Sequence, residues 1–311
     1  MIKRTLYFGN PAYLSKKDEQ LLVRLPEVET NNELPEIFKK EATAIIPIED
    51  IGLMILDDQR ITITQGLVEA LLENNVALVT CDKSHLPTGL LLNLSGNQLQ
   101  SAKFRVQINA SEPLKKQLWQ QTIKAKIANQ AVFLRQNGIE TGNMMHWINE
   151  VKSGDPDNLE ARAASYYWKN AFPAIPGFRR EREGIPPNNL LNYTYAVVRA
   201  IISRSLVGSG LLPTLGIHHR NQYNQYCLAD DIMEPYRPFA DALVAGIVKN
   251  GEDFSELNPS IKRQLLGIAT VDTAFDDERS PLMVAAQRTT ASLARCFEGV
   301  EKKLIYPELI K

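Results

Sequence analysis

The hydrophobic pattern of this chain changes its period near residue 98, and this change limits the folds that the chain can adopt. Before residue 98, short segments rich in branched and aromatic residues are separated by Asn-Pro, Pro and Asp-Asp, which is typical of strands. After it, longer segments repeat apolar residues about every 3.6 positions and stop at Gly, Pro or Asn, which is typical of helices. We therefore predict an α+β protein, with a β-rich domain over residues 1–98 and an all-α domain over residues 99–311.

The expected strands and helices can be placed from the turn and cap residues that flank them. In the β-rich domain, the predicted strands cover residues 5–8, 20–25, 43–48, 51–56, 60–64 and 76–81. Thr64 is expected to cap a helix over residues 65–73, and residues 89–100 are expected to form an exposed connection. In the all-α domain, one helix is expected to begin at Ser111-Glu112-Pro113 and end before Asn137-Gly138. Further helices are predicted over residues 144–151, 159–170, 189–207, 230–249, 259–266 and 281–305.

The composition limits the class of protein. With 44% hydrophobic and 23% charged residues among 311, the chain is typical of a globular protein and unlike a disordered or collagen-like one. The uncharged stretches are too short for a membrane span, and the N-terminus lacks the apolar stretch of a signal peptide, so we expect a cytoplasmic protein with no membrane association. Cys81, Cys227 and Cys296 lie far apart without CxxC spacing, which favours buried apolar cysteines over a zinc ribbon or a disulfide framework.

A net charge of −1 conceals strong segregation of charge along the chain. Residues 18–58 hold eleven acidic side chains and three basic ones. Residues 101–135 hold seven basic and one acidic, and residues 161–229 hold eight basic and two acidic. The overall charge therefore does not exclude a polyanionic partner, although most charged runs are simply solvated faces of a protein.

Three features of the all-α domain carry residue types suited to chemistry. The first is Glu160, which stands at the start of a predicted helix with small residues at positions 161, 163 and 164. The second is the pair His218-His219, in a turn that follows an apolar helix. The third is Asp231 with Glu234, which share one face of a helix and repel each other unless a cation or solvent screens them. Taken singly, each feature is more often a solvated acid or a structural histidine.

Taken together, the three features supply carboxylate oxygens and one imidazole from separate helix ends. This donor set suits a hard divalent cation that keeps positions open for water and a phosphate oxygen, Mg²⁺ or Mn²⁺, more than it suits zinc. Such an ion beside a basic surface points to phosphodiester chemistry. The inference requires three unrelated segments to converge in the fold.

At these residues the sequence resembles the CRISPR-associated integrases of spacer acquisition, the Cas1 family, in the form found in type II systems. The resemblance covers nearly the whole chain through long ordered blocks. They are Arg4-Thr5-Leu6-Tyr7-Phe8, Pro47-Ile48-Glu49-Asp50-Ile51, Asn74-Asn75-Val76-Ala77-Leu78-Val79-Thr80-Cys81-Asp82, Pro113-Leu114-Lys115-Lys116-Gln117-Leu118-Trp119-Gln120-Gln121, Asn192-Tyr193-Thr194-Tyr195, Gly210-Leu211-Leu212-Pro213 and Asp231-Ile232-Met233-Glu234-Pro235-Tyr236-Arg237-Pro238.

The resemblance implies a metal triad. The family's acid in a Glu-small-x-small helix, its His at the end of a Gly-x-x-His turn, and its acid at the end of an Asp-hydrophobic-x-acid motif fall on Glu160, His219 and Glu234. Many family members carry Asp at the last position, where this chain has a side chain one methylene longer. Asp231 and His218 are expected to lie beside the metal ligands without binding the metal, with Asp231 orienting His219 or a bound water.

The resemblance also implies the architecture and the reaction. The first domain is expected to be a β-sandwich that forms a homodimer, and the second an all-α catalytic domain. Two such dimers would flank a dimer of the partner Cas2, and the type II effector nuclease is a further candidate partner. The expected enzyme is a metal-dependent DNA integrase and endonuclease that inserts short double-stranded DNA into a CRISPR array by transesterification at repeat ends. The expected phosphate contacts are Arg162, Arg179, Arg180, Arg182 and Arg220.

Two other classes of function remain open from the sequence. A small-molecule metallophosphodiesterase would use the same ligands in a closed pocket and would show no salt-dependent binding of DNA. A non-catalytic DNA-binding scaffold would bind DNA without metal and would tolerate the loss of Glu160.

Overall fold

The computed structural model describes residues 3–29, 43–275 and 278–310. Contacts within it divide the chain into two compact units, Met1–Gly96 and Asn97–Lys311. We call them the β unit and the helical unit. The division falls within two residues of the boundary that the change of hydrophobic period predicts.

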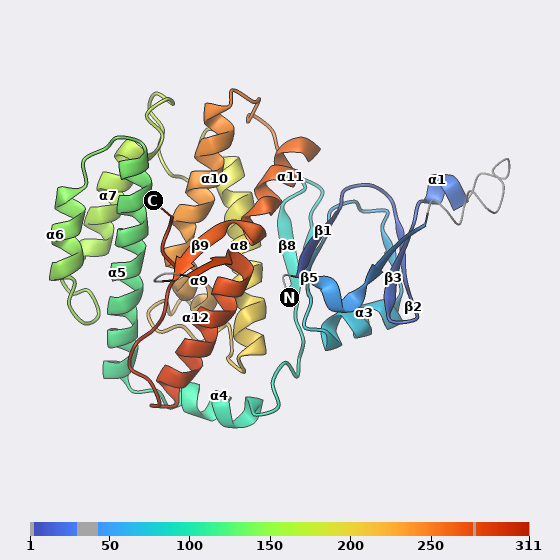
Figure 1. The fold of residues 1–311 in the computed structure, drawn as a ribbon, viewed down its shortest axis with the longest axis horizontal. Coiled ribbons are helices and arrows are strands. Elements are labelled where there is room, and N and C mark those ends of the chain that lie inside the picture. Colours follow the sequence, from blue (N-terminus) through green and yellow to red (C-terminus); the bar gives the residue numbers. More distant parts are fainter. Residues whose placement is uncertain (1–2, 30–42, 276–277, 311) are drawn as a thin grey trace. The chain divides into compact units, whose positions relative to one another are not determined.

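The described strands of the β unit form two sheets (Figure 1). In one sheet, β5 (Ile51–Leu56) pairs in parallel with β1 (Arg4–Phe8) and β7 (Ala77–Cys81), and β8 (Pro87–Leu91) is antiparallel to β7. In the other, β3 (Gln20–Arg24) is antiparallel to β4 (Ala44–Pro47) and β2 (Tyr13–Lys17), and β6 (Thr62–Ile63) pairs with β2 in parallel.

The two sheets and the helix α3 (Gln65–Glu73) bury one common apolar cluster. Leu14 and Leu21 enter it from one sheet, Ile51 and Met54 from the other, and Leu67 from α3. The alternation of buried and exposed residues along half-buried strands produces such a layered core. The arrangement agrees with the expected sandwich-like domain. The short helix α1 (Pro26–Glu29) follows β3.

The β unit differs from the sequence prediction at three points. Strand β2 was not predicted, because its polar residues Ser15, Lys16 and Lys17 hide the alternation. Strand β8 occupies part of the segment that was expected to be an exposed connection; that expectation is wrong, because the Pro-Thr-Gly-Leu-Leu segment pairs with β7. Thr64 stands at the N-cap of α3, but among the described residues its side chain accepts no capping hydrogen bond from the helix.

The helical unit is built around α5 and α8 (Figure 1). Helix α8 (Asn188–Gly208) is mostly buried and contacts α9, α10, α11 and α12, whereas α5 (Glu112–Gln136) contacts α6, α7 and α10. The other helices are α4 (Gln100–Ile108), α6 (Gly142–Glu150), α7 (Leu159–Ala171), α9 (Cys227–Met233), η2 (Glu234–Tyr236), α10 (Arg237–Lys249), α11 (Pro259–Leu266), η3 (Gly267–Thr270) and α12 (Leu282–Phe297). In the β unit, η1 (Ile48–Asp50) precedes β5.

Three predictions for the helical unit need correction. The expected single helix over residues 230–249 is divided at η2. Pro235 has no N–H to donate to the carbonyl of Asp231, and this carbonyl accepts instead from the backbone N–H of Glu234, in a 3₁₀ turn. The unit is also not all-α, because β9 (Asp272–Phe275) and β10 (Glu278–Pro281) form an antiparallel pair. Helix α12 ends at Phe297, earlier than predicted.

The cysteines and the helix lengths agree with the sequence prediction. All three cysteines are free; Cys227 and Cys296 are buried and Cys81 is partly buried. Across the described ranges, every helix is too short or too polar to reach from one side of a bilayer to the other.

A buried carboxyl group in the core of the helical unit predicts a measurable pH dependence of stability. Asp241 on α10 is 1% exposed and accepts hydrogen bonds from the hydroxyls of Tyr195 (2.5 Å) and Tyr167 (2.7 Å). Burial raises the pKa of Asp241 to about 6, although the two tyrosines and Arg237 oppose the shift. Between the unfolded pKa of about 3.8 and the folded value, the folded protein binds more protons, so this contribution to stability decreases as the pH rises.

The variant Asp241→Asn removes this titration while keeping the shape of the side chain. Relative to the variant, the free energy of unfolding of the wild type is expected to fall by about 2 kcal/mol between pH 4 and pH 7. Guanidinium unfolding of both proteins at both pH values measures the difference. Parallel pH profiles for the two proteins would contradict a raised pKa at Asp241.

Candidate active site

Helix α5 provides one wall of the candidate site. Ser111 begins it by accepting a hydrogen bond from the backbone N–H of Leu114 (3.4 Å), with Pro113 in the first turn. Trp119, Lys126 and Asn129 all lie on its buried side. Asn129 donates to the carbonyls of Pro235 (2.8 Å) and Pro307 (3.0 Å), which fixes the turn after Glu234 against α5.

Glu160 is positioned by the start of α7. The N-cap residue, Asn158, has a left-handed backbone (φ 52°), and the side chain that satisfies the first turn is that of Asp155. Its carboxylate accepts from the backbone N–H groups of Leu159 (3.0 Å) and Glu160 (2.9 Å). Glu160 thus lies in the first helical turn, where the helix dipole favours a negative charge.

His219 is held by a turn that closes on Asp231. Asp231 is fully buried and accepts from the backbone N–H groups of His218 (2.9 Å) and His219 (3.2 Å), as well as from the Nδ1 of His219. Since a carboxylate only accepts, Nδ1 carries the proton, and in the neutral imidazole Nε2 keeps its lone pair for another partner. The hydrogen bond to Asp231 raises the pKa of His219 above its ordinary value, against the opposing effect of burial.

Glu234 begins η2 and is nearly buried, with its side chain 8% exposed. One carboxylate oxygen accepts from Nε of Arg237 (2.8 Å) and the other contacts Nζ of Lys126 (2.7 Å). Burial alone would raise the pKa of Glu234, but these two cations outweigh it and lower the pKa to about 2. Glu234 is therefore a carboxylate at neutral pH.

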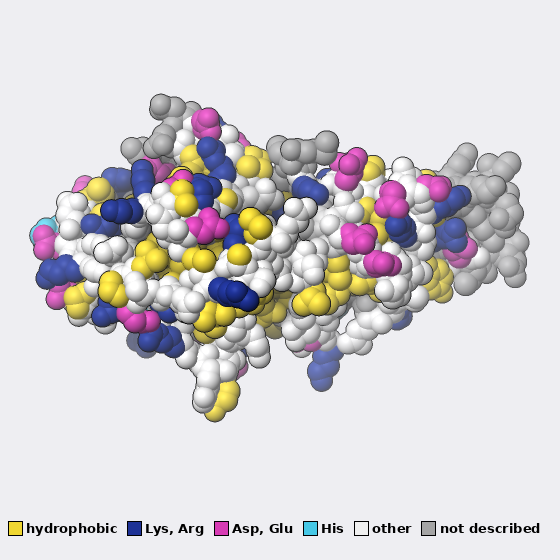
Figure 2. Space-filling view, turned by 90° about the horizontal axis from the view of Figure 1, so that it is seen from below, with side chains coloured by type: hydrophobic (Ala, Val, Ile, Leu, Met, Phe, Trp, Pro, Cys, Tyr) yellow, Lys and Arg dark blue, Asp and Glu magenta, His cyan; other side chains and the backbone are white. Residues whose placement is uncertain are grey.

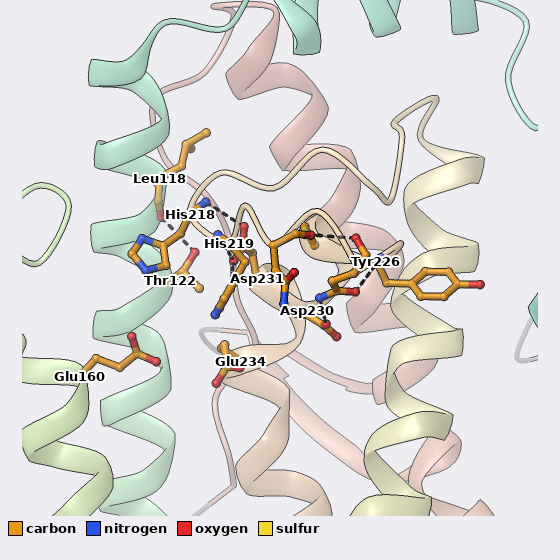
Figure 3. A network of polar contacts seen from close by, with 12 residues as sticks. Leu118, Thr122, Glu160, His218, His219, Tyr226, Asp230, Asp231 and Glu234 are labelled. Carbon is orange, nitrogen blue, oxygen red and sulfur yellow. Dashed lines mark hydrogen bonds and ion pairs between the residues drawn. The ribbon is translucent and has the colours of Figure 1, made fainter. Parts of the chain in front are cut away.

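Lys126 joins the two glutamates. Its Nζ lies 2.7 Å from Oε1 of Glu160 and 2.7 Å from Oε2 of Glu234. Burial would lower the pKa of Lys126, but the two carboxylates raise it above the ordinary value, so the side chain is an ammonium. Figure 3 shows the side chains of Glu160, His219 and Glu234 directed toward one region beside α5, each from a different segment.

The site thus offers two carboxylates that share one ammonium, with the imidazole of His219 directed toward the same region. These are ligands that Mg²⁺ and Mn²⁺ accept. In the arrangement described, no group of three or more His, Cys, Asp or Glu within residues 3–29, 43–275 and 278–310 is close enough to hold a metal ion. A metal could bind to Glu160 and Glu234 together only after the ammonium of Lys126 had moved.

His218 has a different environment from His219. Its ring stacks on the indole of Trp119, with ring centroids 4.0 Å apart and an interplanar angle of 1°. Burial, together with the charge of His219, lowers the pKa of His218. The indole covers one face of this imidazole, whereas the ring of His219 is held by Asp231.

The five predicted phosphate-binding arginines are not equivalent. Arg162, Arg179 and Arg182 are exposed. Arg180 is partly buried and donates to the side chains of Asn188 (2.9 Å) and Asn192 (2.7 Å), which hold the segment before α8. Arg220 pairs with Glu112 at the rim of a pocket of about 470 Å³ that also borders His219. On the face that Figure 2 displays, basic and acidic side chains are interspersed.

Sequence reasoning missed Lys126 as a member of the site and counted it only among the basic residues of the segments 101–135 and 161–229. The structure shows Lys126 to be 8% exposed, and Arg204, another of those basic residues, 2% exposed. A signal was present in the sequence. Lys126 lies three residues after Ile123 and three before Asn129, on the apolar side of α5. A lysine on the buried side of a helix requires a counter-charge, and an acid elsewhere in the chain must supply it.

Known proteins match this chain over most or all of its length. The model of the family "CRISPR associated protein Cas1" matches residues 6–258. The CRISPR-associated endonuclease Cas1 of Neisseria meningitidis serogroup C is 35% identical over 314 residues, covering 100% of this chain and 97% of the relative.

Solved structures show the same fold. A casposase bound to an integration product superposes with a TM-score of 0.76 at 18% identity, covering 98% of this chain and 93% of the other. A Cas6-RT-Cas1–Cas2 complex superposes with a TM-score of 0.73 at 17% identity, covering 98% of this chain and 36% of the other. The family match over most of the chain and the full-length relative lead to one conclusion: this chain belongs to the Cas1 family of CRISPR-associated proteins.

Proposed function

We propose that this protein is a metal-dependent DNA endonuclease and integrase that inserts short DNA fragments into a CRISPR array. The observation that carries the proposal is the convergence of Glu160, His219 and Glu234 from α7, the turn before α9, and η2. The full-length relative that is 35% identical is a CRISPR-associated endonuclease, which supports the same activity.

The residue types present suit a divalent cation. The ammonium of Lys126 lies between Glu160 and Glu234, so the space between them accepts a positive charge, and Nε2 of His219 keeps a free lone pair. Mg²⁺ or Mn²⁺ would be held by Glu160, His219 and Glu234. When bound, such an ion supplies Lewis acidity at a phosphoryl oxygen and at the oxygen that leaves or attacks.

The reaction that we propose is a transesterification in DNA. The 3′-hydroxyl of the fragment attacks a phosphodiester at a repeat end, its proton is lost, and the displaced 3′-oxygen gains a proton. The number of phosphodiester bonds is unchanged, so no covalent enzyme intermediate and no external energy source are needed. Asp231 fixes the ring of His219, and the two cations that flank Glu234 keep it ionised.

The proposed partners are DNA, Cas2 and a second copy of the chain. A neighbour in the Cas1 fold is assembled with Cas2, and another is bound to an integration product. Insertion at both ends of a repeat requires two active sites, whereas each chain supplies a single Glu160, His219 and Glu234. We therefore propose that the chain forms a homodimer through the β unit and joins a Cas2 dimer in a larger complex, with the type II effector nuclease as a further candidate partner.

The direct test of the function is an integration assay. The full-length protein and its Cas2 partner are incubated with a short DNA duplex and a plasmid that carries a CRISPR repeat, with Mn²⁺ or with EDTA. We expect joined products in the reaction with Mn²⁺ and none in the reaction with EDTA. DNA binding without joined products in either condition would favour a scaffold, and hydrolysis of small phosphodiesters without DNA binding would favour a small-molecule metallophosphodiesterase.

Charge removal at Arg179 and Arg182 tests the DNA-binding surface. Both side chains are exposed, so the double variant Arg179→Ala/Arg182→Ala is expected to leave up to two DNA phosphates without a basic partner. The slope of log affinity against log salt should then flatten by up to roughly 0.9 for each such phosphate, and the affinity should fall similarly for unrelated duplex sequences. Fluorescence anisotropy at several salt concentrations measures this slope.

Lys302 and Lys303 offer a matched control for the removal of two neighbouring positive charges, because both are exposed and belong to the segment after α12. Their double substitution with Ala should leave the slope closer to the wild-type value. Equal slopes for the wild type and the Arg179→Ala/Arg182→Ala variant would show that these arginines do not face DNA.

A further inference from the structure

Lys126 stands where a metal between the two glutamates would stand. Its single ammonium contacts both carboxylates at 2.7 Å, and its side chain is 10% exposed. We propose that Lys126 is a resident counter-cation of the site, which keeps Glu160 and Glu234 together in the metal-free protein and has to release at least one of them when a divalent cation binds. This inference rests on the proposed function, because it concerns the same metal site.

Glu160 and Glu234 need a counter-charge between them. Glu160 and Glu234 come from different segments and face each other in a site where Glu234 is almost completely buried. Two carboxylates in such a site repel each other unless a cation lies between them. Arg237 neutralises the far oxygen of Glu234 and does not reach Glu160 in the contacts described, so the bridge between the two acids is Lys126.

The space between the two glutamates is too small for both an ammonium and a metal ion. A bound Mg²⁺ lies about 2.0–2.1 Å from a carboxylate oxygen. Both oxygens of Glu234 already have a cationic partner, Arg237 on one and Lys126 on the other, and Lys126 also holds one oxygen of Glu160. An ammonium and a divalent cation on the same pair of oxygens would come within a few ångströms of each other and repel strongly at low dielectric. They therefore compete, and a metal ion shared by the two glutamates has to displace this ammonium from at least one of them.

The experiment measures Mn²⁺ binding by the metal-free, full-length protein, without DNA or Cas2. Free Mn²⁺ is followed by its electron paramagnetic resonance signal at about 10 °C, where a destabilised variant remains folded. In Lys126→Met, the competing cation is gone, so the Kd for Mn²⁺ should fall at least roughly tenfold. The melting temperature without metal should fall by roughly 5–10 °C, because the carboxylates lose their counter-charge.

Two further variants separate this role from a general effect of removing a buried lysine. Lys262 on α11 is 3% exposed and contacts the ring of Tyr193. Lys262→Met should lose stability and keep the wild-type Kd for Mn²⁺. Lys126→Arg keeps the charge and can bind carboxylates through two N–H groups, so it should bind Mn²⁺ more weakly than the wild type.

The outcomes distinguish this inference from the function on which it rests. Tighter Mn²⁺ binding in Lys126→Met and weaker binding in Lys126→Arg support the resident counter-cation. Saturable binding to the wild type, with equal or weaker affinity in Lys126→Met, overturns the inference and leaves the metal site standing. If Lys126→Met does not fold, an Arg variant that binds as tightly as the wild type overturns it. Absence of saturable binding in every protein overturns the metal site as well.

Discussion

Replacing His219 with Ala is expected to reduce strand transfer by about a thousandfold or more, to the level of the background. Of the three predicted ligands, His219 contributes a ring nitrogen, and its side chain is 44% exposed. Its loss therefore removes a ligand without opening a cavity in the core. Glu160→Ala and Glu234→Ala are expected to abolish strand transfer as well.

The three variants should differ in stability. Glu234→Ala leaves Lys126 and Arg237 without their shared carboxylate in a buried site, so it should be clearly destabilised. At least one member of the triad, Glu234, therefore also stabilises the fold. His219→Ala gives the cleanest separation of chemistry from folding. The measurement is the rate of joined-product formation in Mn²⁺, with thermal melting of each metal-free variant beside it.

His218 is the matched control for His219. It stands in the same turn, but its ring stacks on Trp119. His218→Ala should cost strand transfer much less than His219→Ala. If the two effects were reversed, the assignment of the ligand within Gly216-Ile217-His218-His219 would be wrong.

Adding a single methyl group at Gly216 is expected to reduce strand transfer roughly a hundredfold. A Cβ at this position would overlap the carbonyl oxygen of His219 and lie 2.8 Å from a carboxylate oxygen of Asp231. Both approaches are far closer than van der Waals contact, so the turn has to open in Gly216→Ala. Opening it breaks the hydrogen bonds by which Asp231 holds the backbone and ring of His219.

Gly246 provides the control for this substitution. It lies within α10, and no neighbour among the described residues would come within 4 Å of an added Cβ. Gly246→Ala should keep full activity and gain roughly 0.4–1 kcal/mol of stability, because alanine favours the helix. Integration assays and urea unfolding of both variants test the comparison. Full activity in Gly216→Ala would show that the tight turn does not position the ligand.

The fold could be predicted from the sequence wherever local pattern and tertiary packing agree. Helix α3 has the bounds that its flanking Thr64 and Asn74 predict, and α11 has those that Asn258 and Gly267 predict. Prediction failed where tertiary pairing alone decides the structure. Strand β2 consists largely of polar residues and forms because β3 and β6 pair with it, and β9 forms against β10 with little local strand preference.

The candidate site could be predicted in part. Glu160, His219, Glu234 and Asp231 were singled out by residue type and by resemblance, and the structure brings them into one region. The ion pairs of Lys126 could not be predicted, because Glu160 lies 34 residues away and Glu234 lies far beyond it in the chain. Nor could the sequence separate Arg180, which donates to Asn188 and Asn192, from its exposed neighbours.

The central claim is that Glu160, His219 and Glu234 bind one catalytic metal ion. Anomalous diffraction near the manganese absorption edge, from crystals of the full-length protein grown with Mn²⁺, tests it most directly. We predict an anomalous peak within coordination distance of the carboxylates of Glu160 and Glu234 and of Nε2 of His219. The ammonium of Lys126 should have moved away from at least one of these glutamates. A peak at other residues, or Lys126 still bridging both glutamates with no peak beside them, would contradict the claim.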